Sequence, residues 1–518
     1  MAGERQINWG QDETDATYVT GDAGDGGNFV VAEDTDGATI LLQWNPTAGE
    51  WEYNGPVNMG GNSLTNVDSL DANAVSTGSL ISVSDVVIRP DDDPQTKINN
   101  ANSGDVISAN PLDTHTVSST VEVTTDDVTI VGLGLTLADT SDVPVLKIHN
   151  CSGVTVRNAR IDGNRTNQTA NQFNQTVNGI TITNAESITI EGGEVFDCLN
   201  QGILATSYDD GSADAGDVKN VTIENVDVDN SGNGGVIFAG GGSNISRGGV
   251  LSNCTVTNAD NEHIQAIDGY DYVTFENNRV EGNTPGIAIE SHTGRGATDQ
   301  LGFSIIGNHI EVDANAVLID RNNLRQDGII ISNNTFNILG TGNRGVLMDG
   351  SKADFLTITN NHFRGQSTYE TDSLVGVRIE NGAVINNCNV VGNTFYQLNR
   401  GIYFDNVDVP AQVVANVGEE IGILVRFVDT PDAAAAYNSG LNLNGSDNDL
   451  VRIETSATST QNGNKAIGNH VTNGDNCVTT SGSVDYYIIK NNTSKSSNGT
   501  VSDGAGGANA IVKDNIGY

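Results

Sequence analysis

A short apolar phrase that ends on an acidic residue recurs along the middle of the chain. Its copies end at Asp268, Glu290, Asp320, Asp349, Glu380 and Asp405. Successive acids lie 22 to 31 residues apart. Periods of this length are typical of repeat proteins, in which each unit packs mainly on its neighbours. The chain is therefore expected to fold as a solenoid.

A second phrase recurs in phase with the first, and it pairs an Asn with an apolar residue two positions later. Its copies are Asn278 with Val280, Asn308 with Ile310, Asn334 with Phe336, Asn361 with Phe363, and Asn393 with Phe395. Equivalent residues of successive parallel coils stack at about 4.8 Å. We therefore expect an amide ladder, continued by Asn469, and beside it a stack of interior apolar side chains.

The charge of the chain is strongly acidic. Asp and Glu total 66 against 24 Lys and Arg, which gives a net charge of −42 and argues against nucleic acid or an anionic membrane as partners. An Asp-rich, Lys-poor composition is typical of proteins from molar salt. The Debye length grows from about 3 Å at 1 M salt to about 10 Å at 0.1 M. We therefore expect the protein to lose stability when salt is lowered.

The N-terminal part differs in composition from the rest. All three Trp residues lie within the first 51 positions, and residues 40–53 are expected to form a β-hairpin. We interpret residues 1–70 as an attachment or collar module. The first residues contain no apolar signal region, and no stretch approaches the roughly 18 apolar residues of a membrane span.

The boundaries of the solenoid follow from local signals. We assign residues 71–110 to a linker and an N-terminal cap, with a short helix over 91–104 because Pro94 suits the first helical turn. Residues 111–518 then carry the repeat. Near 410–462 an Ala run and a polar stretch break its phase, so an irregular insertion is expected there.

The helical cap, the irregular coils, the Asn column and phrases such as Ile161-Asp-Gly-Asn164 resemble the pectate-lyase-like superfamily. The resemblance implies an all-β fold: a right-handed parallel β-helix with a small β-rich N-terminal module and a short capping helix. The phrase from Val57 to Val67 is similar to one found near the N-termini of viral tailspikes and tail fibres. With the acidity, this implies a virus of halophilic archaea.

The same resemblance implies a function and partners. We expect a virion structural protein that binds a host cell-surface glycan or glycoprotein, assembles as a homotrimer and contacts other virion proteins through its N-terminal module. Two alternatives stay open, namely a polysaccharide-degrading enzyme and a capsid-surface decoration or turret protein with an adhesive role. The catalytic motifs of polygalacturonases and pectate lyases are absent from the sequence, which favours binding over catalysis.

The six recurring acids form the candidate site. Stacked charges about 5 Å apart repel by about 3 kcal/mol at an effective dielectric of 20, so the column needs a physical reason. It is either a solvated face, a calcium or magnesium ladder in which Asp320 and Asp349 are ligand candidates, or the carboxylate pair of a glycosidase. No other cofactor is expected, and no catalytic residue is assigned.

Arginines in nearby turns provide a counter-charge to the acids. They are Arg295, Arg321, Arg325, Arg344 and Arg400, of which Arg321 and Arg344 are the candidates for the site. Guanidinium groups form bidentate bonds with carboxylate and phosphate-like anions. These arginines are therefore expected either to offset the acids or to bind an acidic glycan.

Overall fold

The computed structural model describes two units of the chain, which divide between Ile81 and Ser82. In the second unit it describes residues 86–517 apart from 172–176, 209–215, 242–243, 292–298, 320–324, 367–372, 409, 444–447, 456–462, 496–500 and 505–509. In the first unit it describes three antiparallel strands, β1 (Asn28–Glu33), β2 (Thr39–Asn45) and β3 (Glu50–Tyr53). The pair β2–β3 is the predicted hairpin.

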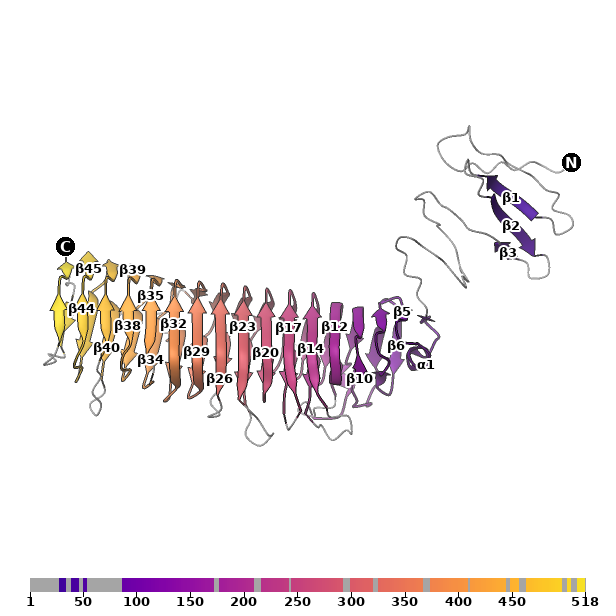
Figure 1. The fold of residues 1–518 in the computed structure, drawn as a ribbon, viewed down its shortest axis with the longest axis horizontal. Helices are drawn as coiled ribbons and strands as arrows, with labels where there is room; N and C mark the ends of the chain where they lie inside the picture. Colours follow the sequence, from indigo (N-terminus) through magenta and orange to yellow (C-terminus); the bar gives the residue numbers. More distant parts are fainter. Residues whose placement is uncertain are drawn as a thin grey trace. The chain divides into compact units, whose positions relative to one another are not determined.

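The second unit is a parallel β-helix with three strands in each coil. From β13 onward each strand pairs with the third strand after it, and Figure 1 shows successive coils stacked side by side from α1 to the C-terminus. Three parallel sheets result, which we number in the order in which a coil passes through them. The alternation of apolar and polar residues makes this possible, because one face of every strand must be buried inside the coil.

The strands of the three sheets are as follows. Sheet 1 contains β4 (Val86–Val87), β5 (Val106–Ser108), β8 (Thr129–Val131), β14 (Val218–Glu224), β17 (Ser246–Ser252), β20 (Tyr270–Glu276), β23 (Gln300–Ile306), β26 (Gln326–Ser332), β29 (Lys352–Thr359), β32 (Val384–Val391), β35 (Ala411–Val414), β38 (Ala434–Ala436), β41 (Lys465–Ile467), β44 (Ile488–Lys490) and β47 (Ile511–Lys513). Sheet 2 contains β6 (Thr114–Val117), β9 (Gly134–Leu137), β15 (Asp227–Ser231), β18 (Thr255–Thr257), β21 (Arg279–Gly282), β24 (His309–Val312), β27 (Thr335–Ile338), β30 (His362–Arg364), β33 (Thr394–Tyr396), β36 (Val417–Glu419), β39 (Ser439–Leu441), β42 (His470–Thr472), β45 (Thr493–Lys495) and β48 (Ile516–Gly517). Sheet 3 contains β7 (Val121–Val123), β10 (Leu146–Ser152), β13 (Ile203–Thr206), β16 (Val236–Ala239), β19 (Ile264–Ile267), β22 (Ile287–Glu290), β25 (Val317–Ile319), β28 (Arg344–Asp349), β31 (Val375–Glu380), β34 (Arg400–Asp405), β37 (Ile423–Val428), β40 (Asp449–Glu454), β43 (Asn476–Ser481) and β46 (Val501–Asp503).

Two long strands pass from one sheet to the next. β11 (Thr155–Asp162) pairs with β8 and then with β9, and β12 (Ile180–Cys198) pairs in turn with β13, β14 and β15. A 3-10 turn, η1 (Arg165–Asn167), lies between them in the chain.

The predicted cap is confirmed as the helix α1 (Pro94–Asn99) at the first coil. Asp93 is its N-cap, accepting a hydrogen bond from the Thr96 N–H at 3.1 Å, and Pro94 lies in the first turn. Ile98 is buried. The helix therefore covers the apolar end of the interior, which would otherwise face water.

The predicted Asn ladder is confirmed and is longer than the sequence pattern indicated. In each step the backbone N–H and the Nδ2–H of one Asn donate to the Oδ1 of the next, as from Asn308 to Asn334 at 2.8 and 3.0 Å. The ladder residues are Asn278, Asn308, Asn334, Asn361, Asn393, Asn416, Asn438, Asn469, Asn492 and Asn515. Cys254 precedes them and donates its N–H to Asn278.

The residue before each ladder position has a left-handed backbone, which explains the repeated Asn-Asn and Gly-Asn pairs. Asn277 and Asn333 have φ values of 55° and 57°, and Gly307 has 68°. Asn and Gly tolerate this conformation better than other residues. The turn from sheet 1 to sheet 2 is thus encoded by two adjacent positions.

The predicted interior stack is also confirmed. Val280, Ile310, Phe336, Phe363 and Phe395 are aligned in register and fully buried. The ring centroids of Phe336 and Phe363, and of Phe363 and Phe395, are 4.8 Å apart. That spacing equals the distance between strands, so the rings follow the coils.

The irregular insertion expected near 410–462 is not found in the part of that range that the structure describes. β35 to β40 continue the pattern of three strands per coil, in register with their neighbours. For these strands the prediction was wrong because small residues such as Ala435 and Gly440 take interior positions there, while residues 444–447 and 456–462 lie outside the described residues. Ala and Gly give no strong apolar signal in the sequence, so the period is not visible there although the strands continue with the same spacing.

Candidate functional site

Three of the six recurring acids align in register on sheet 3. Asp349, Glu380 and Asp405 are direct partners in successive strands, and the same position is Val428 and then Glu454 farther along. Asp268 departs from the column, because Glu290 pairs with Ile267. Asp268 lies instead in the turn after β19 with a φ of 57°. The predicted register is therefore wrong by one residue at this coil.

The interpretation of the acids as a solvated face is also wrong for the three acids that are buried. Asp268, Glu290 and Asp349 are 1%, 6% and 6% exposed. Asp349 accepts a hydrogen bond from the Asn381 amide at 2.5 Å. Glu380 and Asp405 are only half-buried. Neighbouring side chains cover an outward position, which a pattern of alternation cannot show.

A column of arginines and one tyrosine lies two residues before the acids, on the same outer face of sheet 3. Arg378, Tyr403, Arg426 and Arg452 are direct partners in β31, β34, β37 and β40, and we call them the arginine–tyrosine ladder. The guanidinium carbons of Arg378 and Arg426 lie 5.2 and 5.1 Å from the centroid of the Tyr403 ring. Cations at this distance are attracted by the negative face of the ring.

The acids form ion pairs with the ladder arginines. Arg426 donates from Nε and Nη2 to one oxygen of Glu454 at 2.8 and 2.6 Å, and Arg452 pairs with the same carboxylate. Arg378 pairs with Glu380 two residues later. The Tyr403 hydroxyl donates to Asp405 at 2.7 Å; burial and then this bond raise the pKa of Tyr403 to about 12. The column of like charges is thus stabilised by arginines from the same strands.

Two further arginines flank the ladder without such partners. Among the described residues, neither Arg344 nor Arg400 has a carboxylate within ion-pair distance, and the Arg344 Nε is buried without a hydrogen bond. The guanidinium carbon of Arg400 lies 4.6 Å from the Tyr403 centroid. Burial lowers the pKa of both guanidinium groups. The positive charge of Arg378 lowers the pKa of Arg344 further, and that of Arg426 lowers the pKa of Arg400 further. Both are therefore partly desolvated cations.

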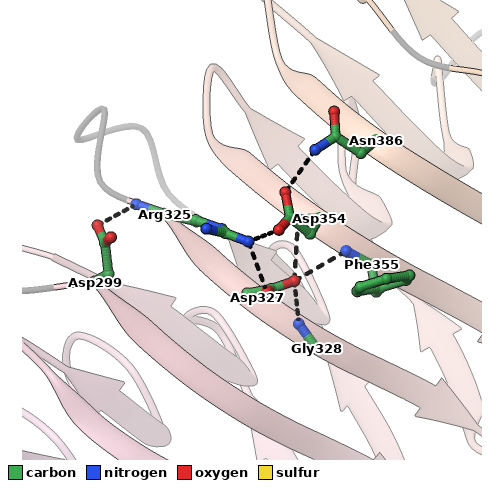
Figure 2. Close-up of polar contacts among 7 residues, drawn as sticks. All are labelled: Asp299, Arg325, Asp327, Gly328, Asp354, Phe355 and Asn386. Atoms are coloured by element: carbon green, nitrogen blue, oxygen red, sulfur yellow. Dashed lines mark hydrogen bonds and ion pairs between the residues drawn. The ribbon is translucent and has the colours of Figure 1, made fainter.

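Arg325, a third arginine singled out in the sequence, has a structural role on another part of the coil. It precedes β26 and pairs with Asp327 at 3.1 Å and with Asp354 (Figure 2). One oxygen of Asp327 accepts hydrogen bonds from the N–H groups of Gly328, Asp354 and Phe355 at 2.8 to 3.0 Å. Figure 2 shows that this network ties neighbouring coils together, which leaves Arg325 engaged by its own chain.

A pair of carboxylates lies nearer the N-terminal end of sheet 3. The Gln265 amide nitrogen is 2.6 Å from an oxygen of Glu262 and 3.4 Å from one of Glu290. All three side chains are buried. The two carboxylate oxygens that share this amide therefore lie at most about 6 Å apart. Carboxyl groups about 5–9.5 Å apart act as a pair in carboxylate-based glycoside hydrolysis.

Several residues named from the sequence lie outside the described residues, namely Asp320, Arg321 and Arg295. The metal-ladder interpretation depends on Asp320, so it stays a prediction. In the part of the chain that the structure describes, no group of three or more His, Cys, Asp or Glu side chains is arranged to hold a metal ion. Nor does any described helix have the length and apolar character to cross a membrane.

The sequence did contain a signal for the arginine–tyrosine ladder. Val377-Arg-Ile-Glu380 and Val451-Arg-Ile-Glu454 carry the arginine inside the recurring phrase, two residues before the acid. Alternation along a strand places both side chains on one face. The acid at the end of each phrase does not by itself identify Arg378, Arg426 and Arg452 as neighbours on one face.

Comparison with known proteins bears out the fold. Residues 212–395 match the family model described as "Right handed beta helix region". The fold is a right-handed parallel β-helix. No curated protein matches the chain.

Solved structures with similar β-helices come from several organisms. One is the A-module of the mannuronan C-5 epimerase AlgE6 of Azotobacter vinelandii, with 15% identity, 82% of this chain and 94% of that chain covered, and a TM-score of 0.39. Another is the N-terminal fragment of bacteriophage Phi29 gene product 12, which has 14% identity and a TM-score of 0.49. The match covers 77% of this chain and 78% of that chain. A third is PfbA, a surface adhesin of Streptococcus pneumoniae, which has 13% identity and a TM-score of 0.43. The match covers 66% of this chain and 86% of that chain. These likenesses concern the fold alone.

Proposed function

We propose that this chain is a structural protein of a virus particle, of tailspike or tail-fibre type, that binds a cell-surface glycan through the outer face of sheet 3. The observation that carries the proposal is the arginine–tyrosine ladder together with Arg344 and Arg400. Together these side chains place five of the 24 Lys and Arg residues of the chain on five successive strands of sheet 3, namely β28, β31, β34, β37 and β40. In a chain with a net charge of −42, so many basic residues on one face are unusual.

The chemistry of this surface suits an extended glycan. Guanidinium groups donate several hydrogen bonds in a fixed plane, and carboxylates accept them from hydroxyl groups. Strands that repeat at about 4.8 Å present such groups in a regular row. A chain of sugar residues can therefore contact equivalent side chains on successive coils.

The assignment to a particle has separate support in the N-terminal sequence. The phrase from Val57 to Val67 is similar to one of viral tailspikes and tail fibres, and it lies outside the described residues. On this proposal the N-terminal unit contacts other virion proteins, the β-helices assemble as a homotrimer, and the protein is located on the particle surface. A capsid-surface protein with the same adhesive role differs only in its place on the particle.

The proposal is tested with an array of purified bacterial and archaeal cell-surface polysaccharides. The full chain should be retained by a subset of them, and Arg378→Gln with Arg426→Gln should weaken that retention. Retention by none of the polysaccharides would contradict glycan binding. Light scattering of the same sample tests the homotrimer.

A second candidate function is polysaccharide degradation, favoured by the Glu262–Gln265–Glu290 arrangement. Two neighbouring carboxylates can act as acid and as nucleophile or base. Incubation of the protein with each retained polysaccharide should then give new reducing or unsaturated ends, and Glu290→Gln should abolish them. Absence of new ends with every retained polysaccharide would leave binding as the function.

A further inference from the structure

The two arginines without carboxylate partners are a distinct feature of the sheet 3 face. We propose that Arg344 and Arg400 form a subsite for an anionic group of the glycan, a carboxylate or a sulfate. This inference rests on the proposed function, and it names the class of glycan that the site takes.

The first step is the position of the two side chains. Arg344 pairs with Val375, and Val375 pairs with Arg400, so the two arginines lie two coils apart at the start of β28 and β34. At about 4.8 Å per strand, their backbones are roughly 10 Å apart. Val375 between them is 1% exposed and carries no charge. The two guanidiniums thus flank a neutral position.

The second step is the electrostatic environment. Glu380, the acid that acts on Arg344, already pairs with Arg378. Glu454, the acid that acts on Arg400, already pairs with Arg426 and Arg452. These two carboxylates are therefore already paired with ladder arginines. Neither of them is left to form an ion pair with Arg344 or Arg400.

The third step is the cost of this arrangement. Removing a cation from water is unfavourable unless an opposite charge replaces the lost solvation. Both arginines are partly desolvated, each has another arginine close by, and the Arg344 Nε is buried without a hydrogen bond. The Nε of Arg325 is likewise buried without a hydrogen bond, but the Arg325 guanidinium is paired with two carboxylates of its own chain. An external anion would compensate the charge that the chain itself leaves unpaired.

The fourth step is the chemistry of the anion. A guanidinium donates two parallel hydrogen bonds to the oxygens of a carboxylate or sulfate, and two guanidiniums select an anion more strongly than one. Tyr403 holds Arg400 against its ring, which restricts the direction of its donors. The subsite therefore favours an acidic polysaccharide over a neutral one.

The test measures binding of the full chain to dextran sulfate, polygalacturonate and unsubstituted dextran in one buffer. The variant is Arg344→Gln with Arg400→Gln. The matched control is Arg157→Gln with Arg279→Gln, which removes two positive charges from exposed ion pairs with Glu191 and Glu281. We expect at least one acidic polymer to bind more tightly than dextran, and the variant to weaken that binding by about tenfold or more. The control should change it by less than about twofold.

Each outcome decides the proposal. Preference for dextran sulfate identifies a sulfate site, and preference for polygalacturonate a carboxylate site. Circular dichroism should show the variant folded like the native protein, so that a loss of binding reports on the subsite. Binding that the variant leaves unchanged, equal binding of dextran and both acidic polymers, or dissociation of the oligomer in the variant would overturn the subsite.

The polysaccharide array distinguishes the two proposals. Retention on the array that the Arg344 and Arg400 variant leaves unchanged would overturn the subsite but leave glycan binding intact. Loss of dextran sulfate binding in the variant, with no retention on the array, would contradict the function while keeping an anion site.

Discussion

Asn334 donates two hydrogen bonds to a single atom of Asn361. Its backbone N–H and its Nδ2–H both lie 2.9 Å from the Oδ1 of Asn361. Asn361 in turn donates to Ile331 and Asn393. Each ladder residue therefore forms hydrogen bonds with buried polar groups of the coils before and after it. These hydrogen bonds stabilise the turn between sheet 1 and sheet 2.

Removal of one ladder residue should be costly. Asn361→Ala leaves the buried N–H of Asn334 and the carbonyl of Ile331 without these partners, at about 1–3 kcal/mol for each such group. We expect the free energy of unfolding to fall by about 3 kcal/mol, measured by urea denaturation. Asn337→Ala is the control, since among the described residues the Asn337 side chain donates one hydrogen bond, to Glu311 at the paired position of the preceding coil, outside the ladder. Equal losses from the two variants would contradict the role of the ladder.

One turn residue should be improved by substitution. Ala415 precedes the ladder residue Asn416 and has a φ of 56°, a conformation that costs a residue with a Cβ about 1–2 kcal/mol. Ala415→Gly should raise the free energy of unfolding by about 1 kcal/mol. Ala411→Gly, in the preceding strand β35, should lower it. A loss of stability from Ala415→Gly would show that this turn is not strained.

The period of the sequence was sufficient to predict a solenoid because interior residues obey it. The Asn column, the aromatic stack and α1 were all predicted from spacing or capping signals. The extent of the coils was not, because Ala435 and Gly440 carry no apolar signal at interior positions.

The site was harder to predict than the fold. Alternation assigns Glu380 and Arg378 to one face, but it does not show which outward side chains are covered, as Asp349 is. Nor does it show which arginines are paired. Arg325 and Arg400 were equivalent in the sequence, and only the contacts of Asp327 and Tyr403 separate a structural arginine from a candidate binding residue.

The acid Asp142 should give the protein a measurable pH dependence. The Thr169 hydroxyl and then the Ala170 N–H hold the pKa of Asp142 below its ordinary value of 3.8. The charged form is thus favoured in the folded state, and its contribution to stability is present above pH 3.8 and is lost as pH falls through the folded-state pKa. The difference in urea midpoint between native protein and Asp142→Asn should therefore shrink from neutral pH to about pH 3. A difference independent of pH would contradict this assignment.

The ring of Tyr403 should matter more for binding than its hydroxyl. Tyr403→Leu removes the surface that Arg378, Arg400 and Arg426 share, whereas Tyr403→Phe removes only the bond to Asp405. Cation–ring contacts contribute about 0.5–2 kcal/mol each. We expect Leu to weaken binding of an acidic polysaccharide by about tenfold and Phe by no more than about threefold. Comparable affinities of the two variants, both folded by circular dichroism, would count against the ring.

The most direct measurement of the central claim is an experimental structure of the full chain with an oligosaccharide of the acidic polymer that it binds. The account predicts that the sugar chain lies across β28, β31, β34, β37 and β40, with an acidic group at Arg344 and Arg400. A sugar chain bound on sheet 1 or sheet 2, or one on sheet 3 that leaves both arginines without contact, would contradict it.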